Sequence, residues 1–206
     1  MDDPTYARTR RALHGVAELL LAGPQHDASG TIRLQAMPNG FGCTASPGTR
    51  VKDGELLLGT KVARLHGRTI AEVGKEIGLE PRSPAALYRD GSGIAPDDRL
   101  EVDEAAADLI ADAFDRGDQA LRAFAADHTP VLWPEHFDLG ITVDEVNYGV
   151  STGDASLEVP YMYVGPWAPP PADDYWNQPY GAARELPGSV ADLLAFFEEG
   201  RRRLSR

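Results

Sequence analysis

Apolar side chains recur at helical spacing near the start of the chain and predict a first helix. The positions concerned are Tyr6, Leu13, Val16, Ala17, Leu20 and Leu21. Asp3-Pro4 is typical of a helix start and Gly23-Pro24 of a helix end, because proline lacks the N–H that a helix interior needs. Arg10 and Glu18 then belong to the solvated face of this helix.

Strands are predicted after this helix, because apolar and polar residues alternate between turn signals. The predicted strands cover residues 31–36, 41–46 and 55–59. Thr69 and Glu72 have the spacing of a capping box, in which each side chain bonds the backbone of the other residue. They predict a helix that ends at Gly78.

The second half repeats this order of elements. Asp103 is placed to cap a long helix, which stops before Thr129-Pro130. The strands predicted after it cover residues 137–143, 146–150 and 161–165. Ser189 is placed to cap a last helix.

These patterns predict an α+β fold with antiparallel sheet and helices packed on one face. The chain is interpreted as a single domain, 1–206, with two helix–three-strand–helix halves, 4–80 and 103–204. The connection between them, 83–100, is rich in Pro, Gly, Ser and Asp. The matching lengths of the first hairpin in each half suggest the hypothesis of an internal duplication.

Composition narrows the classes of partner. The formal net charge of -12 and the pI of about 4.8 argue against non-specific binding to nucleic acid or to an anionic membrane. No apolar run approaches the length of a membrane span, and the start shows no secretory leader. Scarce Lys with abundant Ala, Gly, Asp and Pro is typical of a GC-rich bacterial genome, and the cytoplasm is the expected location.

The chemistry-bearing residues give no complete motif. Cys43 is the only cysteine, which excludes an internal disulfide, and a small buried apolar role is expected for it. His14 lies one helical turn before Glu18, and a backbone carbonyl or Glu18 is the expected partner. A metal role for His14 would need His136 or Asp138 to converge on it. No pattern specifies a cofactor, a metal or an oligomeric state.

Glu135, His136 and Asp138 form the sharpest cluster and are the candidate catalytic residues. On an extended segment, His136 and Asp138 would share one face, as a general base with its orienting carboxylate or as two metal ligands. The alternative is a hydrogen-bonded start of a strand.

Aromatic residues gather around and after the second set of strands. The candidate ligand-binding residues are Trp133, His136, Asp138, Tyr148, Tyr161, Tyr163, Trp167 and Trp176. Such side chains suit pocket walls and loop anchoring alike. The run Pro166–Pro187 is long for a connection, and its aromatic residues favour a loop that is pinned across its own sheet.

The stretch Thr129-Pro-Val-Leu-Trp-Pro-Glu-His-Phe-Asp-Leu139 resembles an uncharacterised bacterial family of unknown function. Members carry a phrase like Pro-Val-x-x-Phe-Trp-x-x-Phe-Asp-Leu ahead of an alternating strand, and a tyrosine-rich strand ending in proline, here Tyr161-Met-Tyr-Val-Gly-Pro166. The first helix and the strand Thr31–Ala36 are similar too. The resemblance implies one fold through both halves and no particular chemistry.

Three function hypotheses follow. The first is a small-molecule-binding protein, with a pocket between the second set of strands and the loop Pro166–Pro187. The second is a hydrolase or isomerase that uses Glu135, His136 and Asp138. The third is an interaction or self-associating module that uses the proline-rich loop or a sheet edge.

Overall fold

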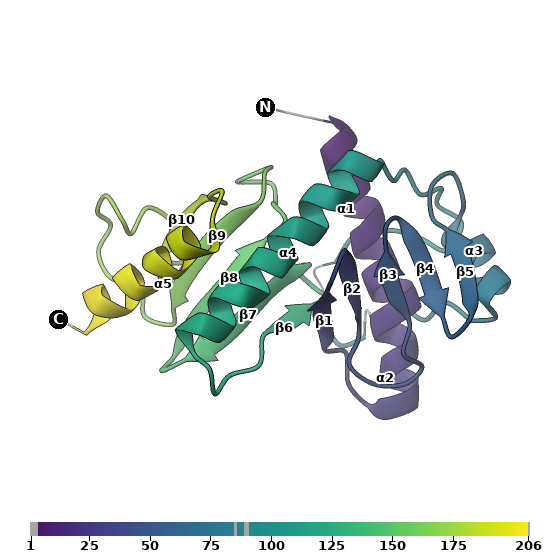
Figure 1. Ribbon diagram of the computed structural model, residues 1–206, viewed down its shortest axis with the longest axis horizontal. Coiled ribbons are helices and arrows are strands. Elements are labelled where there is room, and N and C mark those ends of the chain that lie inside the picture. Colours follow the sequence, from purple (N-terminus) through teal and green to yellow (C-terminus); the bar gives the residue numbers. More distant parts are fainter. Residues whose placement is uncertain (1–3, 85, 89–90, 206) are drawn as a thin grey trace. The chain divides into compact units, whose positions relative to one another are not determined.

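The chain folds into helices and antiparallel strands, so the predicted α+β class is confirmed. The computed structural model describes residues 4–84, 86–88 and 91–205. Its helices are α1 (Pro4–Val16), the π-helix η1 (Ala17–Ala22), α2 (Gly23–Ser29), α3 (Ile70–Ile77), α4 (Glu104–Phe124) and α5 (Val190–Leu204). Its strands are β1 (Leu34–Met37), β2 (Gly40–Cys43), β3 (Arg50–Lys52), β4 (Glu55–Leu58), β5 (Lys61–Arg64), β6 (Val131–Trp133), β7 (Asp138–Val143), β8 (Val146–Ser151), β9 (Tyr161–Pro166) and β10 (Ala182–Glu185) (Figure 1).

The strands lie in the order β10-β9-β8-β7-β6-β1-β2-β3-β4-β5, and paired neighbours run antiparallel. In the described part of the chain each half contributes five strands, where the sequence predicted three. The additional strands are β3, β5, β6 and β10, with three or four residues each. Strands this short show too few alternations to be separated from turns by pattern alone.

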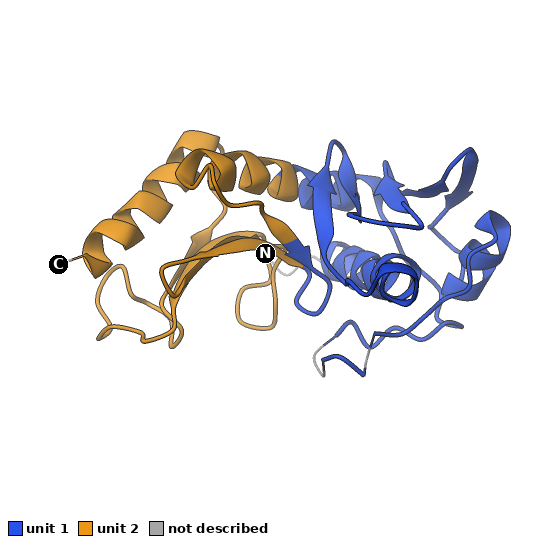
Figure 2. Cartoon of the chain, turned by 90° about the horizontal axis from the view of Figure 1, so that it is seen from below, with its two compact units in different colours: residues 1–112, 132–137 blue, residues 113–131, 138–206 orange. Residues whose placement is uncertain are grey.

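The chain divides into two compact units (Figure 2). Unit 1 consists of Met1–Asp112 and Leu132–Phe137, and unit 2 of Ala113–Val131 and Asp138–Arg206. The division therefore falls within α4, and the predicted connection 83–100 lies inside unit 1. The two units are described separately below.

In unit 1 the first helix does not stop at Gly23-Pro24 but continues to Ser29, so this predicted end is wrong. The segment passes through the π-helix, in which the Gly23 N–H bonds the carbonyl of Glu18 five residues earlier. Proline at position 24 has no N–H for the next carbonyl in that register, that of Leu19. The Arg82 N–H takes the place, donating to Leu19 O at 2.9 Å. A Cβ at Gly23 would lie 1.9 Å from Arg82 O, so glycine permits this close approach.

The predicted helix after Thr69 is confirmed as α3. The Thr69 side chain accepts a hydrogen bond from the Glu72 N–H, the Glu72 carboxylate accepts one from the Thr69 N–H, and Gly78 ends the helix in the left-handed region. Its apolar face, Ile70, Val73 and Ile77, is buried against β4, β5 and η1.

In unit 2 helices α4 and α5 lie on the same face of β7, β8 and β9 (Figures 1 and 2). Tyr148 on β8 contacts Phe124 of α4 and Phe197 of α5, with ring centroids 4.5 and 6.0 Å apart. A Cβ at Gly117 would lie 3.0 Å from the Val150 side chain, so the glycine lets α4 approach the strands closely.

The long loop after β9 is fixed to α5, whereas its aromatic residues predicted a loop pinned across its own sheet. The Tyr175 hydroxyl donates to the Phe196 carbonyl in α5, and Trp176 packs edge-on against the Tyr175 ring. The chain then returns as β10. There the Asn177 amide donates to Ala183 O and accepts from Ala183 N, both at 3.0 Å, on the side of β10 that faces away from β9.

Candidate functional site

The turn between β6 and β7 carries Glu135 and His136 at the surface of unit 1. Residues 134–137 form a turn in which Phe137 has a φ of 51°. His136 Nε2 lies 3.0 Å from Glu135 Oε1. The expected common face of His136 and Asp138 depended on an extended segment, and that assumption is wrong because Phe137 adopts a left-handed conformation.

Phe137 and Pro134 fix this turn to α1. The Phe137 ring stacks on the imidazole of His14, with centroids 5.3 Å apart and planes 7° from parallel. His14 Nε2–H donates to Pro134 O at 2.6 Å, so the expected backbone-carbonyl partner of His14 is confirmed. The turn and the histidine therefore hold each other in place.

Arg10, His14 and Glu18 form a polar stripe, four residues apart along α1 and η1. Glu18 is only 7% exposed, so its predicted place on a solvated face is wrong. Among the described residues, Arg10 Nη1 is a buried atom without a hydrogen-bond partner. The amphipathic pattern identified the apolar face of the helix correctly, but it could not show that a distant segment covers the polar face as well.

That covering segment bonds the Glu18 carboxylate directly. Glu18 accepts from the Tyr88 hydroxyl at 3.0 Å, from the Ser92 N–H at 2.9 Å and from the Ser92 hydroxyl at 2.5 Å. A Cβ on Gly91 would lie 2.4 Å from Glu18 Oε1, so a side chain there would displace the carboxylate. Sequence reasoning missed this site, and a signal was present: Glu18 stands beside the apolar run Leu19–Leu21.

The surroundings of His14 in the polar stripe favour the neutral form of its imidazole. Burial lowers the pKa of His14, opposed by the Glu18 carboxylate and the bond to Pro134, while the charges of Arg10 and His136 lower it further. With its proton on Nε2, His14 presents Nδ1 as an acceptor. Burial also raises the pKa of Tyr88, and the Glu18 charge adds to this. A neutral imidazole and a buried carboxylate on one helix are groups that can exchange protons with a bound molecule.

Asp138, Tyr161 and Tyr163 meet in unit 2, on the face of the strands opposite α4 and α5; we call this the tyrosine face. The Tyr163 hydroxyl donates to Asp138 Oδ2 at 2.5 Å, and the Tyr161 hydroxyl donates to Asp154 Oδ2 at 2.6 Å. Burial raises the pKa of both tyrosines, and the neighbouring carboxylates raise it further. Both hydroxyls therefore stay protonated donors at neutral pH.

Glycines shape the tyrosine face. Gly140 and Gly149 are register partners on β7 and β8, and Tyr163 is paired with Gly149 from β9. A Cβ would lie 2.8 Å from the Tyr163 hydroxyl at Gly140 and 2.4 Å from it at Gly149. The Tyr163 side chain thus crosses two strands over backbone alone and reaches Asp138.

The remaining predicted ligand-binding residues lie elsewhere. Tyr148 is on the helix-covered face of unit 2, and Trp176 packs against Tyr175. Trp167 is 65% exposed. Trp133, in unit 1, lies beneath the guanidinium of Arg33, 5.8 Å from its ring centroid. The structure therefore distributes the predicted residues over several surroundings.

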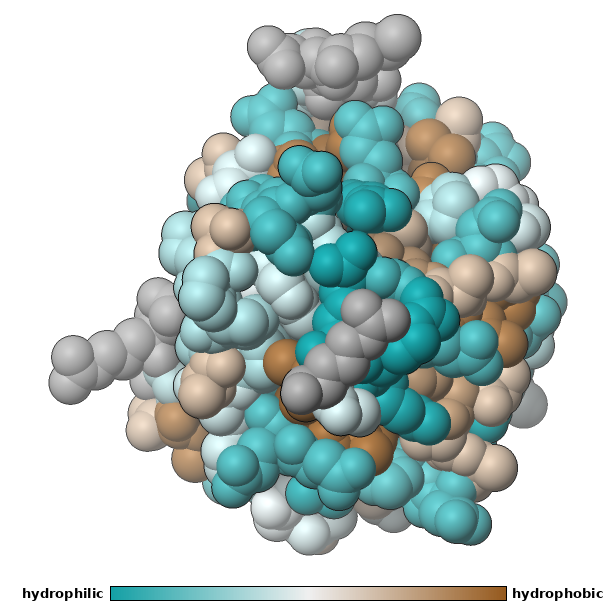
Figure 3. All heavy atoms as spheres, turned by 90° about the vertical axis from the view of Figure 1, so that its left-hand side faces the viewer, coloured by the Kyte–Doolittle hydropathy of each residue, from teal (hydrophilic) through white to brown (hydrophobic). Residues whose placement is uncertain are grey.

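The surface of unit 2 on the side of α5 is largely hydrophilic, and its hydrophobic areas are small and separate (Figure 3). In the loop after β9, Trp167 and Tyr180 are exposed large apolar residues. Scattered apolar residues of this kind are usual on protein surfaces.

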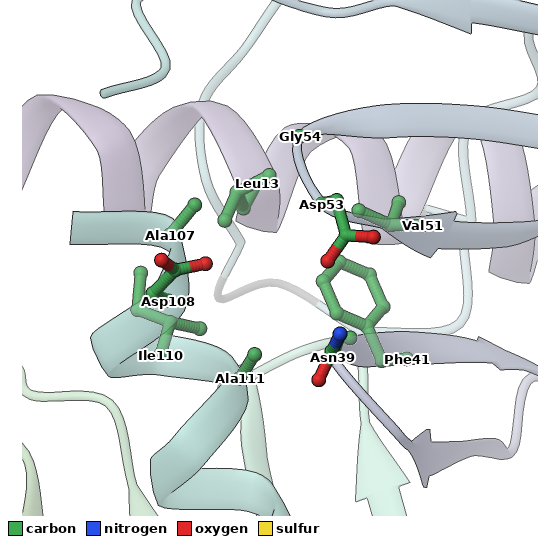
Figure 4. Close-up of a pocket in the computed structure, with 11 residues that line it drawn as sticks. Leu13, Asn39, Phe41, Val51, Asp53, Gly54, Ala107, Asp108, Ile110 and Ala111 are labelled. Atoms are coloured by element: carbon green, nitrogen blue, oxygen red, sulfur yellow. The ribbon is translucent and has the colours of Figure 1, made fainter. Parts of the chain in front are cut away.

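One cavity of unit 1 lies between α1, α4 and the first strands, where Leu13 and Ala107 face Phe41 and Val51 (Figure 4). Its volume is about 10 Å³. That is room for about one water molecule, so it is a packing gap and not a ligand pocket.

A second cavity of unit 1 is an open groove of about 340 Å³. It is lined by Thr5, Arg8, Thr9, His66, Glu101, Val102, Asp103 and Glu104. Arg8 pairs with Glu101 at 2.9 Å, and His66 Nδ1 accepts from the Val102 N–H at 3.2 Å. The neutral His66 ring therefore carries its proton on Nε2.

The structure describes residues 4–84, 86–88 and 91–205. In that part of the chain no three His, Cys, Asp or Glu side chains are grouped so that they could hold a metal ion. Its helices include none with the length and apolar character needed to cross a membrane. Cys43 is buried, as expected, and burial raises the pKa of its thiol to about 11.

The resemblance of residues 129–139 to an uncharacterised bacterial family stays a prediction. Comparison with protein-family models, with curated proteins and with solved structures finds no match for this chain.

Proposed function

We propose that the protein binds a small molecule in the groove of unit 1 lined by Arg8, His66 and residues 101–104. The observation that carries the proposal is the volume, about 340 Å³. This lies within the range of about 300–1,000 Å³ that small-molecule sites occupy. The sequence placed the pocket beside the second set of strands instead, and the tyrosine face remains the alternative location.

The lining indicates a ligand that carries positive charge. Glu101, Asp103 and Glu104 bring three carboxylates to the groove, and Arg8 is its one arginine. The whole chain, with a formal net charge of -12, attracts cations over longer distances as well. The His66 Nε2–H adds a donor for a polar group of the ligand. A compact amine or guanidinium compound fits this chemistry.

Agmatine, which carries one amine and one guanidinium group, is a suitable probe. We expect amide chemical-shift changes at Arg8, His66 and residues 101–104 in an NMR titration, with a Kd of about 1 mM or tighter, a free energy near −4 kcal/mol. Malonate, an anion, should cause no such changes. Glu104→Gln should weaken agmatine binding, and added salt should weaken it further. Asp103 is left intact because its carboxylate accepts from the Ala106 N–H at the start of α4.

Glu198→Gln is the matched control, because Glu198 is also exposed on a helix but lies in unit 2. It should leave agmatine binding unchanged. Chemical-shift changes at Asp138 and Tyr163 in place of the groove residues would show that the ligand binds at the tyrosine face. They would contradict the proposal that the groove is the binding site. Shifts at Glu135 and His136 would instead favour the enzyme hypothesis, which uses these two residues.

A further inference from the structure

Tyr88 and residues 91–94 form a strap that crosses the polar stripe of unit 1. Three of the strap's hydrogen bonds end on the single carboxylate of Glu18. Within the strap, the Ile94 N–H donates to the Ser92 hydroxyl oxygen at 3.1 Å, so Ser92 links the carboxylate to the rest of the segment. The strap is thus organised around one buried acceptor.

Two other contacts hold the strap from outside. Arg11 Nε donates to Ser92 O at 3.1 Å and Arg11 Nη2 donates to Gly93 O at 3.0 Å, both exposed. Ile94 packs directly on the helix at Gly15, where a Cβ would lie 2.6 Å from the Ile94 Cβ. Exposed bonds are weakened by competition with water, whereas the Glu18 bonds are shielded.

The charge of Glu18 decides how well it serves as an acceptor. A carboxylate accepts from several donors at once, and hydrogen bonds to an ionised group are roughly twice as strong as bonds between neutral groups. A neutral side chain at this position would leave some of the strap donors without an acceptor. The described groups that surround Glu18 are Tyr88 and Ser92 of the strap and His14 of the helix. Arg10 and His136 act on His14, and Glu135 acts on Tyr88.

We propose that the Glu18 carboxylate is the latch of this strap, and that loss of its negative charge releases Tyr88 and residues 91–94 and opens the polar stripe to solvent. The device is independent of ligand binding in the groove. The segment it uncovers carries the half-buried His14 and the buried Glu18, two groups suited to exchange protons with a molecule from outside. The π-helix η1 belongs to the same device, because it contains Glu18 and its Leu19 carbonyl accepts from the N–H of Arg82, six residues before Tyr88.

Glu18→Gln tests the latch, because the amide keeps the shape of the carboxylate and removes its charge. Amide hydrogen exchange of the full chain at constant pH 7 is the measurement. We expect the amides of residues 91–94 to exchange about tenfold faster than in the unsubstituted protein, since local opening replaces bonds to a charged group. The strands β7, β8 and β9 should keep their exchange rates.

Glu72→Gln is the matched control. Glu72 also accepts a backbone N–H, that of Thr69, but in the exposed capping box of α3. It should speed exchange only in the first turn of α3. An unchanged exchange rate of residues 91–94 in Glu18→Gln overturns the latch.

A second pair of variants covers the case in which Glu18→Gln does not fold. Tyr88→Phe with Ser92→Ala leaves Glu18 charged and removes two of the three donors, and should also speed exchange of residues 91–94. Arg11→Ala should have a smaller effect than this double variant. If Arg11→Ala alone frees the strap as fully, the exposed arginine is its anchor and the latch proposal fails.

Discussion

At the scale of single residues, the half-buried His14 makes stability depend on pH. Its pKa in the folded chain is lowered, chiefly by burial, so the unfolded chain takes up a proton first as the pH falls. Stability is therefore complete above the ordinary histidine pKa of about 6.5 and decreases below it, by at most about 1.4 kcal/mol per pH unit from this group.

Urea unfolding at pH 7.5, 6.5 and 5.5 measures this dependence. His14→Phe keeps a ring that can stack on Phe137 but removes the titrating group. It should lower stability at pH 7.5, because the bond to Pro134 is lost, and flatten the slope between pH 6.5 and 5.5. His128→Gln removes an exposed histidine as a control. An undiminished slope in His14→Phe would show that another group is responsible.

In the polar stripe, the partner of His14 could be predicted from the sequence, but the burial of Glu18 could not. The backbone-carbonyl partner of His14 could be expected, because a buried histidine needs a nearby acceptor and every peptide provides one. The burial of Glu18 could not be expected, because Tyr88 and Ser92 come from a segment 70 to 74 residues away in sequence. A helical pattern carries no information about such distant partners.

At the scale of elements, the strands of unit 2 tolerate added side chains very unevenly. Gly149 and Gly165 lie on neighbouring strands and on the same face. A Cβ at Gly149 would lie 2.5 Å from Leu139 O, a backbone atom that cannot move aside, whereas at Gly165 the nearest atom is 3.7 Å away. Substitutions at these two positions therefore give a matched pair of variants for the tyrosine face.

We expect Gly149→Ala to lower the free energy of unfolding by about 1–3 kcal/mol, as overpacking does in a close-packed interior. It should also displace the Tyr163 hydroxyl from Asp138, visible as an altered Tyr163 absorbance in the near ultraviolet. Gly165→Ala should change stability by less than about 0.5 kcal/mol. Equal effects of the two variants would contradict this account of the tyrosine face.

Elements with a long pattern or a defined cap could be predicted, and short ones could not. The capping box at Thr69 and the cap at Ser189 each start a helix in the structure. The strand β6 has three residues and the turn after it has Phe137 at positive φ, a conformation that no aromatic residue signals in sequence. Because this turn interrupts the alternation of side chains along a strand, His136 and Asp138 do not share a face and have different partners.

At the scale of the whole molecule, α4 is the element that both compact units share. Ala107 and Ile110 are buried residues of its first part, Phe114 and Leu121 of its second. A unit that unfolded alone would have to break this helix, and the remaining unit would lose half of a helix that fills its core. We therefore expect one cooperative unfolding transition in spite of two units.

Tryptophan fluorescence can follow each unit, because Trp133 belongs to unit 1 and Trp167 and Trp176 to unit 2. The variant Trp133→Phe and the double variant Trp167→Phe, Trp176→Phe should each unfold in urea with the same midpoint by fluorescence as by circular dichroism. Asp112→Pro, which interrupts α4 at the division between the units, should separate the midpoints. Separate midpoints without that proline would disprove the shared-helix account.

The two halves of the chain have the same order of elements, which extends the hypothesis of an internal duplication. A helix, five consecutive antiparallel strands and a helix occur from α1 to α3 and again from α4 to α5. The predicted similarity of the halves therefore holds for the order of elements, although the predicted number of strands was too low.

Asn177 has a consequence for how the protein behaves at high concentration. An outermost strand with unoccupied N–H and C=O groups is a template on which another polypeptide can add, and such addition leads to fibrils. Here both groups of Ala183 are already occupied by one side-chain amide. An incoming chain would have to displace Asn177 before its first hydrogen bonds at this residue could form, so the loop that carries Asn177 protects the molecule from growing into a larger sheet.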